Sequence, residues 1–171
     1  MSRYILAHDY EACIGCQACE IHCKTNKGLG PGASPCKILA TGPVLNGRVP
    51  SVRFVFMPCF HCEDAWCLRA CPTGAVKRRD KDGIVYIDQS LCIGCKSCIT
   101  ACPWGAAQWD PGTGKAIKCD LCKERLDEGL KPACVTKCVT QCLELAEAAT
   151  ISAARRRHWA GVIAAGGELA P

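Results

Sequence analysis

Sixteen of the eighteen cysteines in this chain fall into four groups of four, and this grouping limits the possible folds more than any other feature. In the first and third groups the spacing is C-x2-C-x2-C-x3-C, the ligand run of paired [4Fe–4S] clusters in which the fourth cysteine binds the other cluster. Thiolates are soft, anionic ligands that hold iron in tetrahedral sulfur surroundings. The sequence therefore predicts four [4Fe–4S] clusters. The expected iron ligands are Cys13, Cys16, Cys19 and Cys23; Cys59, Cys62, Cys67 and Cys71; Cys92, Cys95, Cys98 and Cys102; and Cys119, Cys122, Cys134 and Cys138.

Zinc is the alternative metal, because paired C-x2-C units also make structural zinc sites. Zinc motifs usually place two cysteines, a gap and two more, and they do not put three cysteines at x2 spacing before a fourth. The first and third groups therefore favour iron. The second and fourth groups depart from the run, since four residues separate Cys62 from Cys67 and eleven separate Cys122 from Cys134. Taken alone, the fourth group would fit either metal.

Composition bears on stability and on partners. Aromatic residues make up 6% of the 171 residues, so the apolar core should be modest and the clusters should act as staples. Metal binding and folding are then one event, and the apo-protein should be largely unfolded. The formal net charge is +5, but an oxidised cluster with four thiolates carries about −2. Four clusters bring the total to about −3, so we expect no nucleic-acid partner.

Targeting signals are not found in the sequence. The first nine residues, MSRYILAHD, lack the apolar segment and cleavage site of a signal peptide. No stretch approaches the roughly 18 apolar residues of a membrane span. We expect a soluble, cytoplasmic chain without a membrane span, although a partner with its own export signal could carry it across a membrane.

An internal repeat organises the chain, because residues 9–16 match residues 88–95 in spacing and largely in chemistry. Short helical turns should lead to the fourth cysteine of each group. The pattern predicts an α+β fold of short hairpins and helices, with residues 1–142 as the cluster-binding domain and 143–171 as a C-terminal helix and tail. Strands are expected over 3–7, 51–57, 75–78, 84–87, 107–109 and 115–118, turns at Asn46-Gly47, 80–83 and 110–114, and helices over 120–128 and 143–159.

Six short motifs carry a resemblance to a known family. The motifs are Cys13-Ile14-Gly15-Cys16, His61-Cys62, Cys71-Pro72-Thr73-Gly74-Ala75, Cys102-Pro103-Trp104-Gly105-Ala106, Lys118-Cys119-Asp120-Leu121-Cys122 and Gly129-x-x-Pro132-Ala133-Cys134-Val135. With them, residues 5–140 resemble the four-cluster ferredoxin subunits of the molybdenum and tungsten pterin oxidoreductases, of the dimethyl-sulfoxide reductase electron-transfer type. The chain departs from the family at Trp66 and Val139, where proline is usual, and either change could alter solvent access or potential at its cluster.

The resemblance implies how the groups share clusters. An outer module would join groups 13–23 and 119–138, and an inner module would join groups 59–71 and 92–102, each like a bacterial two-cluster ferredoxin. The implied ligand sets are Cys13, Cys16, Cys19 and Cys138 (cluster 1); Cys23, Cys119, Cys122 and Cys134 (cluster 2); Cys59, Cys62, Cys67 and Cys102 (cluster 3); and Cys71, Cys92, Cys95 and Cys98 (cluster 4).

The remaining polar residues near the groups receive modest roles. Cys36 and Cys142 are left over and are expected to be small buried hydrophobes, with a substitute-ligand role unsupported. His22 and His61 adjoin ligand cysteines and are expected to pack or to donate a hydrogen bond to sulfur rather than bind iron. His8 and His158 receive no role. Cationic neighbours of the ligands could raise a cluster's potential, although a solvated surface charge is favoured for each: Lys24, Arg69, Lys96 and Lys118.

A chain that carries four clusters and little else is expected to move electrons. It has no glycine-rich dinucleotide fingerprint, phosphate loop or nucleophile–base set, so we expect an electron-transfer subunit without substrate chemistry of its own. The resemblance implies a large molybdenum- or tungsten-pterin catalytic subunit and a flavin or other redox subunit as partners. It is strongest to the small iron–sulfur subunit of the multi-subunit bacterial tungsten aldehyde oxidoreductases.

Other systems stay open. The same short form resembles ferredoxin subunits of formate dehydrogenases, hydrogenases and carbon monoxide dehydrogenases. Self-association into an extended wire and docking of a partner on the C-terminal helix are further hypotheses, and a zinc-binding interaction module is the remote alternative.

Overall fold

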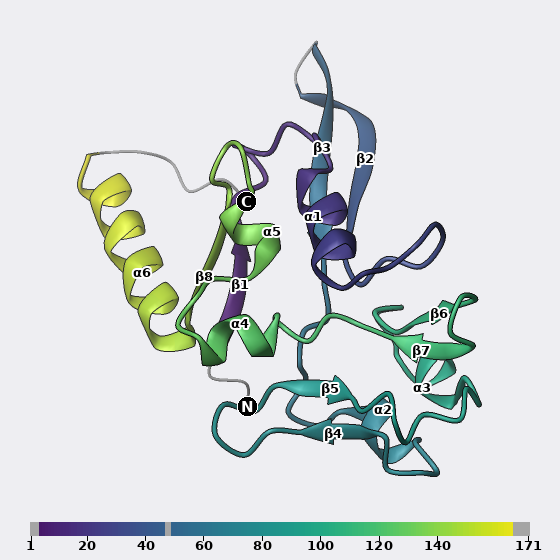
Figure 1. Cartoon of the computed structure of the whole chain (residues 1–171). Coiled ribbons are helices and arrows are strands. Elements are labelled where there is room, and N and C mark those ends of the chain that lie inside the picture. Colours follow the sequence, from purple (N-terminus) through teal and green to yellow (C-terminus); the bar gives the residue numbers. More distant parts are fainter. Residues whose placement is uncertain (1–3, 47–48, 166–171) are drawn as a thin grey trace.

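The computed structural model describes residues 4–46 and 49–165 as short helices and two-stranded antiparallel sheets (Figure 1). The strands are β1 Tyr4–His8, β2 Lys37–Asn46, β3 Val49–Met57, β4 Val76–Arg78, β5 Val85–Ile87, β6 Gln108–Asp110, β7 Lys115–Ile117 and β8 Leu143–Glu147. The helices are α1 Ala18–Asn26, α2 Trp66–Arg69, α3 Ser97–Thr100, α4 Lys123–Asp127, α5 Ala133–Thr136 and α6 Ala148–Ala164. The predicted α+β class is confirmed, and the helices α1, α2, α3 and α5 bear or lead to the fourth cysteines as expected.

Three hairpins follow from local turn chemistry. β4 pairs with β5 and β6 with β7, as predicted from the glycines between them. Gly83 has a φ of 70° and its N–H bonds to the Arg79 carbonyl at 2.8 Å, which closes the first of these turns. β2 pairs with β3 around an irregularity between Thr41 and Val44. The turn predicted at Asn46-Gly47 lies partly outside the described residues.

Two segments that lie far apart in the sequence pair in one sheet. β1 pairs with β8 in antiparallel register, from Tyr4 opposite Glu147 to His8 opposite Leu143. The helix predicted over 143–159 is therefore wrong in its first five residues, which form β8, and α6 begins at Ala148 and ends at Ala164. The segment LELAE alternates apolar and polar residues, and the available edge of β1 decides between strand and helix. The division into 1–142 and 143–171 stays a prediction.

The core is built largely from thiols and small side chains. One buried cluster packs around the ends of α1, α5 and β8: Cys19, Cys23, Cys36, Phe56, Cys134, Cys142 and Leu143. A second packs among the two small hairpins: Ala65, Val76, Val85, Cys98, Ala107 and Ala116. Ile84, Cys119 and Leu121 form a third. So many buried cysteines leave little hydrocarbon to hold the fold without a metal.

The helix α6 lies at the edge of the molecule in Figure 1 and packs only lightly on it. Its neighbours are β8 and β1, and none of its residues is buried. Over the described residues, no helix combines the length and apolar character that a bilayer crossing requires.

Candidate iron–sulfur sites

The two C-x2-C-x2-C-x3-C loops follow nearly the same path. Gly15 and Gly94 have φ values of 68° and 70°, a left-handed conformation that glycine adopts without strain. An aspartate opens each loop: the Oδ1 of Asp9 accepts the Glu11 N–H at 3.0 Å, and that of Asp88 accepts the Ser90 N–H at 3.0 Å. The exposure of the thiols also repeats. Cys13 and Cys92 are half-buried, Cys16 and Cys95 are exposed, and Cys19 and Cys98 are buried.

Each loop shares a cavity with a cysteine from elsewhere in the chain. The first loop's cavity is completed by Cys138, which follows α5, and the second loop's by Cys71, which follows α2. The thiols around the first cavity are Cys13, Cys16, Cys19 and Cys138, with Cys142 as a fifth. Those around the second are Cys71, Cys92, Cys95 and Cys98.

A third cavity of about 360 Å³ is walled by aromatic rings. Its thiols are Cys59, Cys62, Cys67 and Cys102. Phe60 and Trp104 meet edge to face with ring centroids 5.4 Å apart, and Trp66 completes the wall. Trp66, where proline is usual in the family that this chain resembles, is 53% exposed at the mouth of this cavity.

A fourth group of thiols is buried where α1, α4 and α5 come together. Its members are Cys23, Cys119, Cys122 and Cys134, each 8% exposed or less. Burial, and then the neighbouring sulfurs of Cys23 and Cys122, raise the pKa of Cys134 to about 12. Burial likewise raises the pKa of Cys119 well above its ordinary value. Such crowded thiols can all be anionic only around a cation, so this donor set fits an iron cluster.

Hydrogen-bond donors point at several of the sulfurs. The backbone N–H of Ala106 donates to Cys102 Sγ at 3.4 Å, and that of His61 donates to Cys59 Sγ at 3.4 Å. The side-chain amide of Asn26 lies 3.8 Å from Cys122 Sγ. Donors of this kind favour the thiolate over the thiol and tune the metal that it binds.

Both leftover cysteines are buried, as predicted. Cys36 is 2% exposed and Cys142 is 8% exposed. A hydrogen bond from Cys36 lowers the pKa of Cys23. Cys142 Sγ lies 3.4 Å from Cys138 Sγ, and burial followed by that neighbour raises its own pKa to about 12. The hydrogen bond to Cys23, and then burial, raise the pKa of Cys36. Each spare thiol therefore holds its proton more tightly than the predicted ligand beside it.

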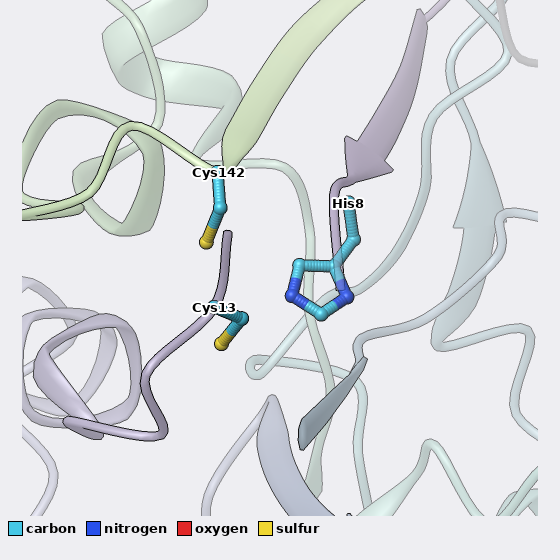
Figure 2. A group of neighbouring side chains, drawn as sticks. All are labelled: His8, Cys13 and Cys142. Atoms are coloured by element: carbon cyan, nitrogen blue, oxygen red, sulfur yellow. The ribbon is translucent and has the colours of Figure 1, made fainter. Parts of the chain in front are cut away.

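His8, for which no role is expected from the sequence, lies beside Cys13 and Cys142. Figure 2 shows it with Cys13 and Cys142, and the ligand atoms of the three residues lie within 4.8 Å of one another. Its Nδ1 accepts the Phe56 N–H at 3.3 Å, while its Nε2 is buried without a partner in the described structure. The signal was present in the repeat: His8 stands one residue before the loop aspartate, where the second copy has Ile87.

The charged residues next to the predicted ligands differ in their exposure and in their partners. Lys96 lies over the Trp109 ring at 4.3 Å, and Arg69 pairs with Asp64 at 3.0 Å on the surface. Lys118 is 7% exposed, so the surface location expected for it is wrong. His61 is 3% exposed, which agrees with the packing role predicted for it, and the N–H that bonds to Cys59 Sγ is its backbone N–H. A side-chain hydrogen bond from His61 to sulfur stays a prediction. Lys24 and His22 are half-buried.

Comparison with known proteins identifies the class. Residues 51–148 match the family described as 4Fe-4S dicluster domain. The thiosulfate reductase electron transfer subunit PhsB of Salmonella typhi is 41% identical over 145 residues, which cover 84% of this chain and 75% of PhsB. YnfG of Escherichia coli strain K12, a probable anaerobic dimethyl sulfoxide reductase component, is 39% identical over 171 residues, covering 96% of this chain and 80% of YnfG.

The fold, the thiol cavities and these matches define an iron–sulfur electron-transfer protein. The chain belongs to the 4Fe-4S dicluster family, and its relatives are electron-transfer subunits of the thiosulfate and dimethyl sulfoxide reductase type. The predicted family resemblance and the role as an electron-transfer rather than a catalytic subunit are confirmed. The family description names two clusters, and the matched segment leaves out the first cysteine group.

Proposed function

We propose that the chain binds four [4Fe–4S] clusters and relays electrons between a molybdenum- or tungsten-pterin catalytic subunit and a second redox partner. The observation that carries this proposal is that the sixteen grouped cysteines gather into four sets of four thiols. The proposed ligand sets are Cys13, Cys16, Cys19 and Cys138; Cys23, Cys119, Cys122 and Cys134; Cys59, Cys62, Cys67 and Cys102; and Cys71, Cys92, Cys95 and Cys98.

The chain's own groups prepare these sets for the metal. When bound, a cluster supplies one-electron redox chemistry, and the protein sets its potential through charge, hydrogen bonds and burial. The Ala106 and His61 N–H groups donate to sulfur, and the aromatic rings of Phe60 and Trp104 limit the access of water to the third set. Hydrogen bonds to the sulfurs and an apolar wall of this kind tune the metal group that the thiols hold.

Metal analysis of anaerobically purified protein tests the cluster count. Four clusters require about sixteen iron atoms and about sixteen sulfides per chain, a brown colour and a paramagnetic signal after dithionite reduction. About eight of each would leave the family's two clusters and refute the other two. A colourless protein with zinc would replace the proposal by the zinc-binding module.

The partner subunit follows from the relatives' names and is a proposal at two levels. A reductase catalytic subunit with a pterin cofactor is supported by relatives named for thiosulfate and dimethyl sulfoxide reductases. A tungsten aldehyde oxidoreductase with a flavin subunit is the finer proposal, and formate dehydrogenase, hydrogenase and carbon monoxide dehydrogenase systems are the alternatives.

The cytoplasm is the proposed compartment of the chain. Cell fractionation followed by immunodetection of the chain tests this proposal.

Purification of the native complex distinguishes these partners. The proteins that copurify with a tagged chain should include one large subunit that contains a pterin with molybdenum or tungsten. Metal analysis of that subunit separates the reductase type from the tungsten enzyme. The mass of the intact complex gives the copy number of this chain, and one copy would end the hypothesis of an extended wire.

A further inference from the structure

Lys118 is buried between two of the thiol sets. It follows β7 and directly precedes Cys119, and its residue is 7% exposed. Its ammonium nitrogen lies 3.3 Å from Cys59 Sγ and 2.8 Å from the Cys119 carbonyl oxygen, and it also donates to the Val85 carbonyl. Cys59 belongs to the aromatic-walled set and Cys119 to the fully buried set. One ammonium group therefore contacts a sulfur of the aromatic-walled set and the backbone of the fully buried set.

The anion that balances this charge is sulfur. Among the ion pairs within residues 4–46 and 49–165, none includes Lys118. A buried ammonium group is unfavourable unless a nearby anion compensates it. The carbonyls of Val85 and Cys119 offer only dipoles, and the carboxylates that line a cavity with Lys118, such as Asp88 and Asp120, form no ion pair with it in the described part of the chain. The group of anionic character in direct contact with the ammonium nitrogen is the Cys59 sulfur, 3.3 Å away.

His61 presents a second donor to the same cavity. Its Nδ1 accepts the Val85 N–H at 3.0 Å, so the ring proton is on Nε2. The Nε2 atom is buried and has no partner in the described structure, although His61 is only 3% exposed and lines the cavity with Cys59. A buried N–H without an acceptor is rare in folded proteins, and it indicates an acceptor that arrives with a bound group.

Val85 fixes both donors at once. Its N–H holds the His61 ring and its carbonyl holds the Lys118 ammonium group, and the residue itself is 1% exposed in β5. Hydrogen bonds within a strand that is paired to β4 leave little freedom for either side chain. The two donors are thus held rigidly rather than free to turn toward solvent.

We propose that Lys118 and His61 tune electron transfer at the junction of the two modules. This inference rests on the proposed function. Lys118 places positive charge between the clusters held by Cys59 and by Cys119, and His61 donates its Nε2–H toward sulfur of the cluster held by Cys59. Both side chains would stabilise the reduced, more negative state of a bound cluster and so raise the reduction potential of that cluster. Bound clusters would supply the one-electron chemistry, and Lys118 and His61 would contribute charge and a hydrogen bond to it without forming or breaking bonds of their own.

The test is a potentiometric titration followed by electron paramagnetic resonance. Lys118→Met removes the charge at similar volume, Lys118→Arg keeps it, and Lys137→Met is the matched control, since Lys137 also precedes a proposed ligand but is exposed. We expect Lys118→Met to lower the reduction potentials of the two nearby clusters by at least about 59 mV, the shift that corresponds to a tenfold change for one electron. At the wild-type midpoint potential, the ratio of reduced to oxidised cluster should therefore fall at least tenfold. Lys118→Arg should retain most of the wild-type potential, and Lys137→Met should leave all signals unmoved.

The outcomes separate the inference from the function on which it rests. Wild-type protein without iron and sulfide would refute the proposed function. Variants with full iron content and unmoved potentials would refute only the inference, as would an equal shift in Lys137→Met. His61→Asn, which keeps an acceptor for the Val85 N–H and removes the Nε2 donor, should lower the potential of one cluster alone.

A measurement on the unaltered protein covers the case in which Lys118→Met loses its clusters. Protein with ¹⁵N-labelled lysine, reduced by dithionite, should show a nitrogen hyperfine coupling in pulsed resonance spectra, because Lys118 Nζ lies 3.3 Å from a proposed ligand sulfur. ¹⁵N-labelled histidine should show a coupling that His61→Asn removes. Spectra without a lysine coupling would overturn the role of Lys118.

Discussion

The loops 13–23 and 92–102 share one cysteine spacing and nearly one backbone path, and they differ in what surrounds them. Behind Gly15 stands the Phe54 ring from β3, whereas behind Gly94 stand the Gly114 carbonyl and the Trp109 ring. The first loop continues into α1 of nine residues, and the second into α3 of four. The same cysteine spacing is therefore held in place by different neighbouring residues in the two loops.

The difference extends to the sulfur surroundings. Near the thiols of the first loop lie the spare thiol of Cys142 and the ring of His8. The cavity of the second loop is lined by four thiols, without a fifth among the described residues. A threonine hydroxyl beside the completing cysteine is common to both cavities, 3.7 Å from Cys71 and 3.9 Å from Cys138. Charge, hydrogen bonds and burial around sulfur set the potential of a cluster. One repeated motif can therefore serve two clusters of different potential, because the motif forms the loop and the neighbours form the environment.

Removal of iron should abolish the difference between the loops, and it is the largest effect expected. Without a metal group, nothing links the four thiols of each set, and the small apolar clusters between them cannot hold the fold. We expect chelation under anaerobic, reducing conditions to remove most of the far-ultraviolet circular dichroism signal. A native-like spectrum at zero iron would show that hydrocarbon packing suffices.

Removal of single thiols should separate ligand from neighbour in the first cavity. Cys138→Ala should lose one cluster's share of iron or convert that cluster to a form with fewer irons. Cys142→Ala should keep the wild-type iron content, because the two sulfurs lie 3.4 Å apart and the contact lowers the pKa of Cys138 while it raises that of Cys142, so Cys138 is the better metal ligand of the pair. Iron and sulfide determination measures both variants. Equal iron loss in the two would mean that Cys142 is itself a ligand.

Much of this arrangement could be predicted from the sequence because it depends on local chemistry. The hairpins β4–β5 and β6–β7 follow from glycines such as Gly83 and Gly114, whose φ values of 70° and 66° suit tight turns. The left-handed backbone at Gly15 and Gly94 follows from the ligand spacing in the same way. The four groups of cysteines follow from their spacing, whereas the way in which the groups share clusters came from the family resemblance and stays a proposal.

The features that could not be predicted depend on contacts between distant segments. Leu143–Glu147 form a strand because β1, from the other end of the chain, offers an edge. Lys118 is buried because Val85 and Cys59 meet beside it, and nothing in the residues around position 118 indicates that meeting. The place of His8 beside Cys142 depends on the pairing of β1 with β8, so the sequence difference from Ile87 in the repeat does not by itself show what His8 contacts. In each case tertiary packing decided among conformations that the local sequence allowed.

The glycines of the two loops should differ in their tolerance of a side chain. A Cβ on Gly94 would lie 2.3 Å from the Gly114 carbonyl oxygen, which is backbone, whereas a Cβ on Gly15 would lie 2.5 Å from the Phe54 ring. Gly28 has a φ of 63° and nothing within 4 Å, so Gly28→Ala adds only backbone strain of about 1–2 kcal/mol. Gly94→Ala should cost about 3 kcal/mol, and Gly15→Ala an intermediate amount, because a ring can move.

The midpoint of cluster loss in guanidinium, followed by visible absorbance, ranks these three variants. The expected order of resistance is Gly28→Ala, then Gly15→Ala, then Gly94→Ala. Equal midpoints for the two loop variants would show that the backbone carbonyl behind Gly94 yields as readily as the ring behind Gly15. The two loops would then differ less in rigidity than their neighbours suggest.

Deletion of α6 should have the smallest effect and should show where the outer module ends. No residue of α6 is buried, so a chain that stops at Glu147 should keep its iron and its guanidinium midpoint. A chain that stops at Cys142 is the matched control, because it also removes β8, in which Leu143 is 4% exposed and paired with His8 of β1. The shorter chain should lose iron from the first cavity, since Cys138 and His8 are then no longer held across the sheet. Full iron content in both truncated chains would support the division at residue 142 and would mean that β8 contributes nothing to the cluster sites.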